Sequence, residues 1–185
     1  MLRNTDNAYG WLHRLLHWLL ALMIIGMIGV GIYMTGLNED IPAEKARQQL
    51  LGGLHKATGM IVFALVIIRL FWALTNITPA LPDTVPAWQR KAAKGMHHLL
   101  YLLMICVPAT GYIMVSYVEK PVDIYGLFSI PPLFSKNIDK AMEFSEIHEI
   151  LAFILLGLII LHFIIALKHH FVDKDNVLKR MLSGD

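Results

Sequence analysis

The sequence predicts an all-α integral membrane protein, an antiparallel four-helix bundle that forms a single domain over residues 1–185. Hydrophobic residues make up 56% of its 185 positions and charged residues only 16%, whereas soluble domains carry about 25% charged residues. Four apolar runs reach the roughly 20 residues that a helical span needs. Because the hydrocarbon core offers the backbone no hydrogen-bond partner, these runs must be helical.

The four spans follow one another through loops of unequal length. We expect helices over about 11–34, 52–74, 93–117 and 145–171. The first run is too long for the apolar core of a signal peptide, and no A-x-A-like site follows it, so we expect it to be retained.

The loops carry the prolines. Pro42 lies in the first loop, and three further prolines are expected to keep the second loop extended, namely Pro79, Pro82 and Pro86. Pro108 and Gly111 predict a kink in the third helix. The loop over 118–144 is the longest, and a loop of that length is either a lid over a site or a passive cover.

The distribution of basic residues predicts the orientation. Ten of the 16 Lys and Arg residues fall on the side of the termini, and the other side holds nine of the 14 acidic residues. We therefore expect a multi-pass protein of the bacterial inner (plasma) membrane with both termini cytoplasmic. The basic residues are dispersed, which indicates contact with anionic lipid head groups and no nucleic-acid partner. The single Cys106 excludes an internal disulfide, and no C-x-x-C-H is present for covalent haem attachment.

The most informative spacing lies in the last apolar run, where His148 and His162 are fourteen residues apart. Fourteen residues are close to four helical turns, so both rings project from one side of the helix, about 21 Å apart along it. His55 begins the second helix at the outer level, and His17 lies near the inner end of the first. Depth therefore pairs His17 with His162 and His55 with His148.

Two facing imidazoles inside a bundle fit the two axial positions of a haem iron, and such a six-coordinate site suits electron transfer. Zinc fits less well because it takes four ligands. One intramembrane histidine is readily explained by a hydrogen bond between helices, but four at matched depths are not. His13, one turn before His17, is a competing ligand candidate nearer to water.

Three further residues are candidates for the inner site. Arg69 follows His55 by fourteen residues, so it lies on the same helix face at the inner level. It would pair with haem propionates or would be an ordinary interfacial anchor, and both interpretations stay open. His97 and His169 lie at the inner mouth of the bundle, where a histidine can hydrogen-bond a quinone carbonyl and shuttle its proton.

Several segments together resemble the bacterial cytochrome b561 family of small di-haem membrane proteins. They are LHWLL at His17, LHKATGMIVFALVIIRLFW, HHLLYLLMICVPATGYIM, KPVDIYG and EIHEILAFILLGLIILHFIIALKHHFVDKDNVLKRML. The resemblance implies His17 and His162 as axial ligands of the inner haem iron, and His55 and His148 of the outer. It also favours His17 over His13, because the family's ligand precedes a tryptophan, here Trp18. One branch of the family is a superoxide oxidase, and there the histidine matching His169 lies at the quinone site. His97 matches a family histidine of the third helix.

We therefore expect electron transfer across the membrane through two b-type haems, from a periplasmic one-electron donor to the ubiquinone pool. With superoxide as the donor, the protein would be a superoxide:ubiquinone oxidoreductase, although no catalytic residue is assigned. The alternatives are a haem-bearing anchor subunit for a partner dehydrogenase or hydrogenase, and a proton or metal transporter that uses the same histidines. The expected partners are the lipid bilayer, a quinone and an unidentified donor, with a homodimer or a partner subunit left open.

Overall fold

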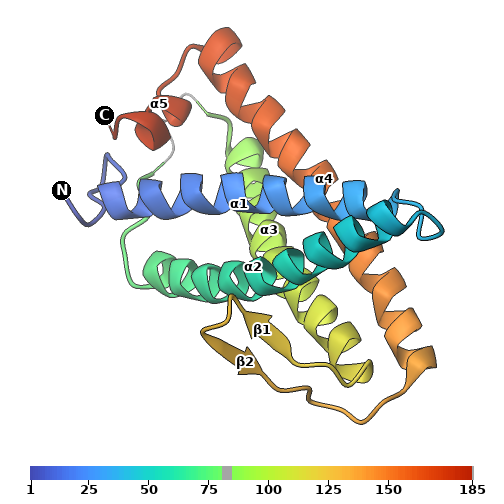
Figure 1. Ribbon diagram of the computed structural model, residues 1–185. Coiled ribbons are helices and arrows are strands. Elements are labelled where there is room, and N and C mark those ends of the chain that lie inside the picture. Colours follow the sequence, from blue (N-terminus) through green and yellow to red (C-terminus); the bar gives the residue numbers. More distant parts are fainter. Residues whose placement is uncertain (81–84, 185) are drawn as a thin grey trace.

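Four long helices dominate the computed structural model, which describes residues 1–80 and 85–184 (Figure 1). They are α1 (Trp11–Thr35), α2 (Pro42–Leu74), α3 (Ala87–Tyr117) and α4 (Ile138–Lys168). Each is long and apolar enough to cross a membrane, which confirms the predicted all-α membrane bundle. A small hairpin of β1 (Val122–Ile124) and β2 (Phe128–Ile130) joins α3 to α4, and a π-helical turn η1 (His169–Asp173) and α5 (Val177–Leu182) follow α4.

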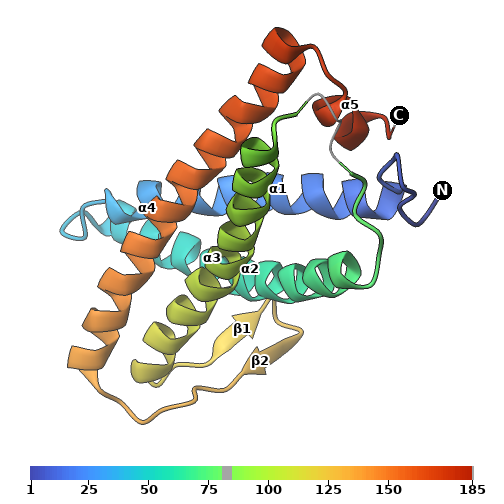
Figure 2. The same cartoon turned by 180° about the vertical axis from the view of Figure 1, so that it is seen from behind.

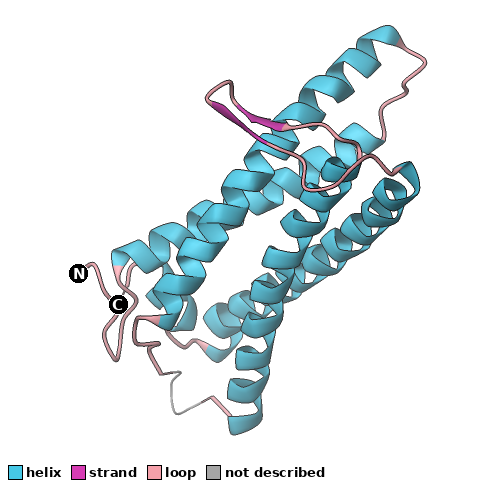
Figure 3. Cartoon of the chain, turned by 90° about the horizontal axis from the view of Figure 1, so that it is seen from below, coloured by secondary structure: helices cyan, strands magenta, loops and turns pink. Residues whose placement is uncertain are grey.

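The bundle consists of two antiparallel helix pairs that cross each other. Helix α1 packs along α2, and α3 packs along α4, with α2 and α3 joining the pairs (Figures 1 and 2). Helices α1 and α4 make few contacts with each other. Both termini lie together, and we call this the terminal end; the loop end is where residues 36–41 and 118–137 connect the helices (Figure 3).

Aliphatic side chains from all four helices form the core between the two ends. It consists of Leu20, Ile24, Val62, Val66, Leu100, Leu103 and Leu155. Leu155 lies seven residues from both His148 and His162, so this core separates the two histidine levels. At most 17% of the most apolar window of each span is buried inside the protein. The remaining surface is suited to lipid, where packing and hydrogen bonds hold helices together.

Three helices begin earlier than hydropathy predicts. Helix α2 starts at Pro42, where the ring occupies the first helical turn and Glu44 lies at the positive end of the helix dipole. The predicted start at residue 52 was therefore wrong, because 42–51 is a polar helical segment rather than a loop. Likewise α3 starts at Ala87 instead of 93, directly after Pro86.

Helix α4 starts at Ile138 instead of 145 because Asn137 caps it, its side-chain oxygen accepting from the Lys140 N–H at 3.0 Å. At its other end the α-helix stops at Lys168 and continues as the π-helical turn to Asp173, past the predicted end at residue 171. Helix α3 runs through Pro108 without interruption, and the kink stays a prediction. Pro82 lies outside the described residues.

The long connection between α3 and α4 contains a packed hairpin. Tyr125 and Gly126 have φ angles of 53° and 74°, which is the backbone of a tight two-residue turn. Val122 and Ile124 are buried against α2 and α3, and the Tyr125 hydroxyl lies 2.6 Å from Thr58 Oγ1. The hairpin is therefore a fixed cover on α2, one turn from His55.

The N-terminal segment is fastened to the terminal end by a buried side chain. Asn4 Nδ2 donates to the Ile77 carbonyl at 2.8 Å, and Asn4 Oδ1 accepts from the Gly10 N–H at 2.9 Å. A Cβ at position 10 would lie 2.3 Å from the Leu2 carbonyl oxygen, so only glycine fits there. The segment therefore links the start of α1 to the end of α2.

Replacing Asn4 by Ala is expected to lower the free energy of unfolding by about 1–3 kcal/mol, because it leaves buried backbone groups without partners. Thermal unfolding in detergent, followed by circular dichroism, measures the change. Asn7→Ala is the matched control, since Asn7 is exposed. Equal midpoints for the two variants would contradict the fastening role.

Candidate functional site

The structure brings four histidines together as two pairs at two levels of the bundle. The ring centroids of His17 and His162 are 6.3 Å apart, and those of His55 and His148 are also 6.3 Å apart. Helix α4 supplies one ring to each pair, while α1 and α2 supply one each. The fourteen-residue spacing on α4 therefore becomes two sites, one toward each end of the bundle.

Both separations suit a metal held between two rings. A bond from a metal to an imidazole nitrogen is about 2 Å long. Two such bonds on opposite sides of the metal, together with the distance from each bonded nitrogen to the centre of its ring, give a centroid separation close to the 6.3 Å observed. No hydrogen bond joins the rings within either pair among the described residues. The two pairs therefore fit bis-histidine haem ligation.

The surroundings of His148 leave one ring nitrogen free for a metal. Its Nδ1 lies 2.8 Å from the Val107 carbonyl oxygen, and a carbonyl only accepts, so Nδ1 carries the proton. The lone pair of Nε2 is then available, which is the usual arrangement of a metal-binding histidine. The facing His55 has its Nδ1 buried without a hydrogen-bond partner.

Two glycines let helix backbones approach this pair. A Cβ at Gly111 of α3 would lie 3.0 Å from both Cε1 and Nδ1 of His148, and a Cβ at Gly31 of α1 would lie 3.5 Å from His55 Cε1. Small residues are typical of close helix contacts in membranes. The sequence pattern indicates Gly111 only as a source of a kink, although a glycine inside an apolar span is also a signal for such a contact.

At the other level, Arg69 binds His17 directly. Arg69 Nη2 lies 2.9 Å from His17 Nδ1, and Arg69 Nε donates to the Tyr101 hydroxyl at 3.1 Å. A guanidinium only donates, so His17 Nδ1 accepts here. Arg69 thus points into the bundle at the level of the His17–His162 pair, and Tyr101 is a partner that sequence spacing did not reveal.

The other histidine candidates near this pair have different neighbours. The His97 ring centroid is 5.4 Å from that of His162, and His97 Nδ1 donates to the Ala93 carbonyl at 2.7 Å. The His13 ring stacks on the Tyr9 ring beside the N-terminal segment, with the two ring centroids 4.6 Å apart. Burial of Tyr9 raises the pKa of its hydroxyl. His97 therefore lies at the histidine pair, and His13 faces the N-terminal segment.

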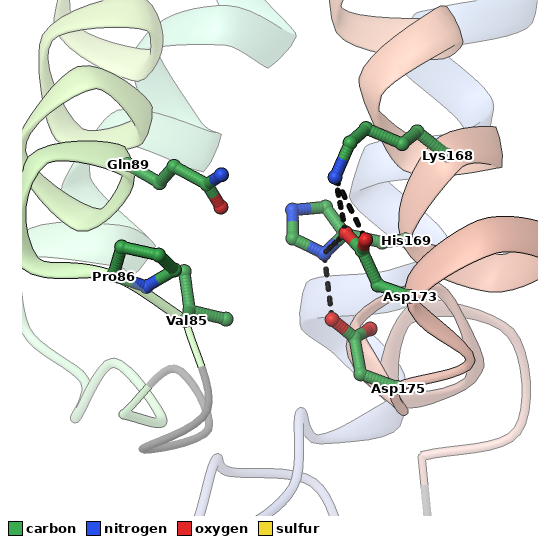
Figure 4. A pocket seen from close by; sticks show the side chains of 7 residues that line it. All are labelled: Val85, Pro86, Gln89, Lys168, His169, Asp173 and Asp175. Carbon is green, nitrogen blue, oxygen red and sulfur yellow. Dashed lines mark hydrogen bonds and ion pairs between the residues drawn. The ribbon is translucent and has the colours of Figure 1, made fainter.

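His169 belongs to a separate pocket at the terminal end, between η1 and the start of α3 (Figure 4). The cavity has a volume of about 340 Å³, and its lining residues are Val85, Pro86, Gln89, Lys168, His169, Asp173 and Asp175. His169 Nδ1 lies 2.6 Å from Asp175 Oδ2. Six residues separate the two along the chain, so only the π-helical turn, which helical periodicity does not predict, brings them together.

Four membrane-spanning helices with two facing histidine pairs define a membrane cytochrome of the b type. Residues 8–184 match the family described as prokaryotic cytochrome b561, and the chain belongs to this family. It is 33% identical over 180 residues to cytochrome b561 homolog 2 of Escherichia coli (strain K12), with 97% of this chain and 93% of that protein covered.

Two further relatives are similar over nearly the whole chain. Cytochrome b561 homolog 1 of Escherichia coli (strain K12) is 30% identical over 167 residues, covering 90% of this chain and 92% of the relative. The probable superoxide oxidase CybB of Yersinia pestis is 30% identical over 177 residues, which cover 95% of this chain and 96% of that protein. Membership of the family implies haem b binding, electron transfer across the membrane and a multi-pass location in the bacterial inner membrane.

Replacing Arg69 by Met is expected to lower the midpoint potential of one haem and to leave the other unchanged, because a nearby cation favours the reduced, less positive iron. A spectroscopic redox titration measures both potentials. Lys91→Met removes an exposed cation of the terminal end and is the control. Potentials that shift equally in both variants would show that Arg69 acts only as part of the general surface charge.

Proposed function

We propose that this chain carries electrons across the inner membrane through two haem b groups, from a one-electron donor outside to the ubiquinone pool. The observation that carries the proposal is the presence of two histidine pairs with equal separations of 6.3 Å at two depths. His17 and His162 would hold one haem, and His55 and His148 the other. When bound, the haems supply one-electron redox chemistry at two levels. Residues 1–185 would act as one cytochrome b domain.

The terminal end is proposed to be cytoplasmic. Ten of the 16 basic residues belong to this side by the sequence pattern, and basic residues are enriched in cytoplasmic loops. The His17–His162 pair and the His169 pocket then face the cytoplasm. The His55–His148 pair, at the end of the bundle where the hairpin packs on α2, faces the periplasm and the donor.

The protein's own residues would prepare each level in a different way. Near the periplasm, the Val107 carbonyl holds the tautomer of His148 that leaves Nε2 free. Near the cytoplasm, ligation through Nε2 of His17 would require Arg69 to release Nδ1 of that ring. The guanidinium would then be free for a propionate, the planar anion that its geometry matches. Leu155 and the core around it would keep water out between the levels.

Superoxide is the donor that the Yersinia pestis relative suggests, since that protein is named a probable superoxide oxidase. A second candidate function is a haem-bearing anchor subunit for a partner dehydrogenase or hydrogenase. The hairpin favours it, because Leu127 at its turn is 81% exposed and Phe128 is 60% exposed. Co-purification of a stoichiometric partner from native membranes would support the anchor.

The test is a redox titration of the purified protein with and without ubiquinone. The proposal expects the spectrum of low-spin haem b, two haems per chain, and oxidation of the reduced haems by ubiquinone. A protein with one haem or none would contradict the two-site arrangement, and uptake of protons or metal into liposomes without haem would favour a transporter. Quinone reduction under a superoxide flux decides the donor, because a rate no faster than the uncatalysed one rejects superoxide.

A further inference from the structure

We propose that Asp175 is a positioning residue that makes His169 the proton donor to a quinone bound in the terminal-end pocket. This inference rests on the proposed function and adds to it the residue that controls proton delivery. It follows from the hydrogen bonds around the two side chains and from the shape of the pocket.

The His169–Asp175 contact is short, sheltered and fixed from both sides. His169 Nδ1 lies 2.6 Å from Asp175 Oδ2, and the two side chains are only 12% and 10% exposed. The other carboxylate oxygen, Oδ1, accepts from the Val177 N–H at 3.0 Å, at the start of α5. Asp175 N–H donates to the His169 carbonyl at 3.1 Å. The carboxylate is therefore held in place by the backbone of two elements.

This contact decides which ring nitrogen faces the ligand. A carboxylate only accepts, so Nδ1 of His169 carries a proton and Nε2 is left for another partner. Figure 4 shows the second ring nitrogen directed away from Asp175 and toward the side of the pocket that Gln89 forms. Gln89 offers an amide that both donates and accepts. When the ring is doubly protonated, Nε2 donates as well, and a ligand with two carbonyl oxygens on an apolar ring then suits this pair, with Val85 and Pro86 beside it.

The same cluster is less suited to a metal ion. His169, Asp173 and Asp175 have ligand atoms within 4.8 Å of one another. However, the Lys168 ammonium lies 2.8 and 2.6 Å from the two oxygens of Asp173, so this carboxylate already has a cation. Asp173 Oδ2 also lies 3.3 Å from His169 Nδ1, but the contact with Asp175 is shorter, at 2.6 Å. The His169–Asp175 pair therefore has the distance of a hydrogen bond, which orients the ring for proton transfer.

The chemistry balances with groups already named. Reduction of a quinone to a quinol takes up two electrons and two protons. The electrons come from the outer donor by the proposed path, which ends at His162, seven residues or about 10 Å along the helix from His169. His169 delivers one of the two protons: the N–H bond at Nε2 breaks, an O–H bond forms at the nearer quinone oxygen, and the ring takes a replacement proton from the solvent at the terminal end. The second quinone oxygen takes its proton from the solvent. The Asp175 carboxylate stabilises the doubly protonated ring between these events.

The experiment compares two electron acceptors on the same reduced, haem-loaded protein. Stopped-flow absorbance follows haem oxidation by decylubiquinone, which needs protons, and by ferricyanide, which does not. Asp175→Asn is expected to slow oxidation by decylubiquinone about tenfold, less than the roughly 10²–10⁴-fold effect of a general acid itself because His169 is retained, and to leave the ferricyanide rate unchanged. Asp175→Glu, which keeps the carboxylate, is expected to recover most of the rate. Asp139→Asn, an exposed position at the other end of α4, is the matched control.

Each other outcome has a defined meaning. Equal slowing with both acceptors would show a structural fault, and an unchanged decylubiquinone rate would show that Asp175 has no part in proton delivery; either overturns the proposal. Stoichiometric Zn²⁺ binding lost in Asp175→Asn, with unchanged oxidation rates, would make the cluster a metal site instead. If decylubiquinone does not oxidise the wild-type protein while ferricyanide does, the quinone function itself fails, and this inference with it. Haem content reports folding, and His169→Gln gives the same comparison if Asp175→Asn loses haem.

Discussion

Replacing His162 by Ala is expected to lower the haem content from the proposed two groups per chain to one, because the variant removes one of the two proposed axial ligands at a single level. His17 alone would leave the iron without its partner on α4. The other ring beside His162, that of His97, donates from Nδ1 to the Ala93 carbonyl of its own helix. The His55–His148 pair lies on the far side of Leu155 and should keep its haem. Pyridine haemochrome analysis against protein concentration measures the ratio, and low-temperature spectra identify which absorbance band is lost.

Two controls separate ligation from general damage around this pair. His97→Ala removes a ring that also contacts His162, at a centroid distance of 5.4 Å, and is expected to keep both haems. His13→Ala is expected to do the same, because that ring faces Tyr9. If His97→Ala lost one haem while His17→Ala kept both, His97 would be the partner of His162 and the assignment of His17 would be wrong.

Replacing Gly111 by Ala is expected to weaken haem binding at the His55–His148 level by roughly tenfold or more. The added Cβ would lie 3.0 Å from two atoms of the His148 ring, and this ring cannot retreat without losing its bond to the Val107 carbonyl. Overpacking of this kind costs about 1–3 kcal/mol, and 1.4 kcal/mol corresponds to a factor of ten in affinity. Haem titration of the apoprotein in detergent measures the change.

Two other glycines of the spans complete the comparison. A Cβ at Gly31 would meet His55 Cε1 at 3.5 Å, an ordinary contact, and a Cβ at Gly157 would meet nothing within 4 Å. The loss of haem affinity is therefore expected to be largest for Gly111→Ala, much smaller for Gly31→Ala and close to zero for Gly157→Ala. Equal losses in all three would mean that helix flexibility, and not the space beside His148, determines binding.

The histidine levels could be predicted because two physical rules are enough. Helical periodicity fixes which residues of one span share a face, and distance along the span fixes their depth. His148, His162 and Arg69 were placed in this way, and in the structure each lies beside a residue of its expected level. Helix starts could not be predicted from hydropathy, since the first turns of α2 and α4 are polar and depend on Pro42 and on the Asn137 cap.

The finer features of the site depend on contacts that leave no periodic signal. The bond between His148 and the Val107 carbonyl joins two helices, and no spacing within one helix indicates it. The same is true of the Arg69–Tyr101 bond. Asp175 reaches His169 only because the chain passes through a π-helical turn and a left-handed residue, Lys174 with a φ of 53°. Sequence patterns indicate which residues are present at a level, while tertiary packing decides which atoms meet.

The sparse contact between α1 and α4 bears on how this protein is assembled in the cell. Each helix packs well against its antiparallel neighbour, and the two hairpins meet mainly where α2 packs against α3. The His17–His162 level is where α1 and α4 would be tied together, and a ligand that binds only the closed arrangement stabilises it by mass action. Binding at this level would therefore add to the stability of the assembled bundle as well as to its function.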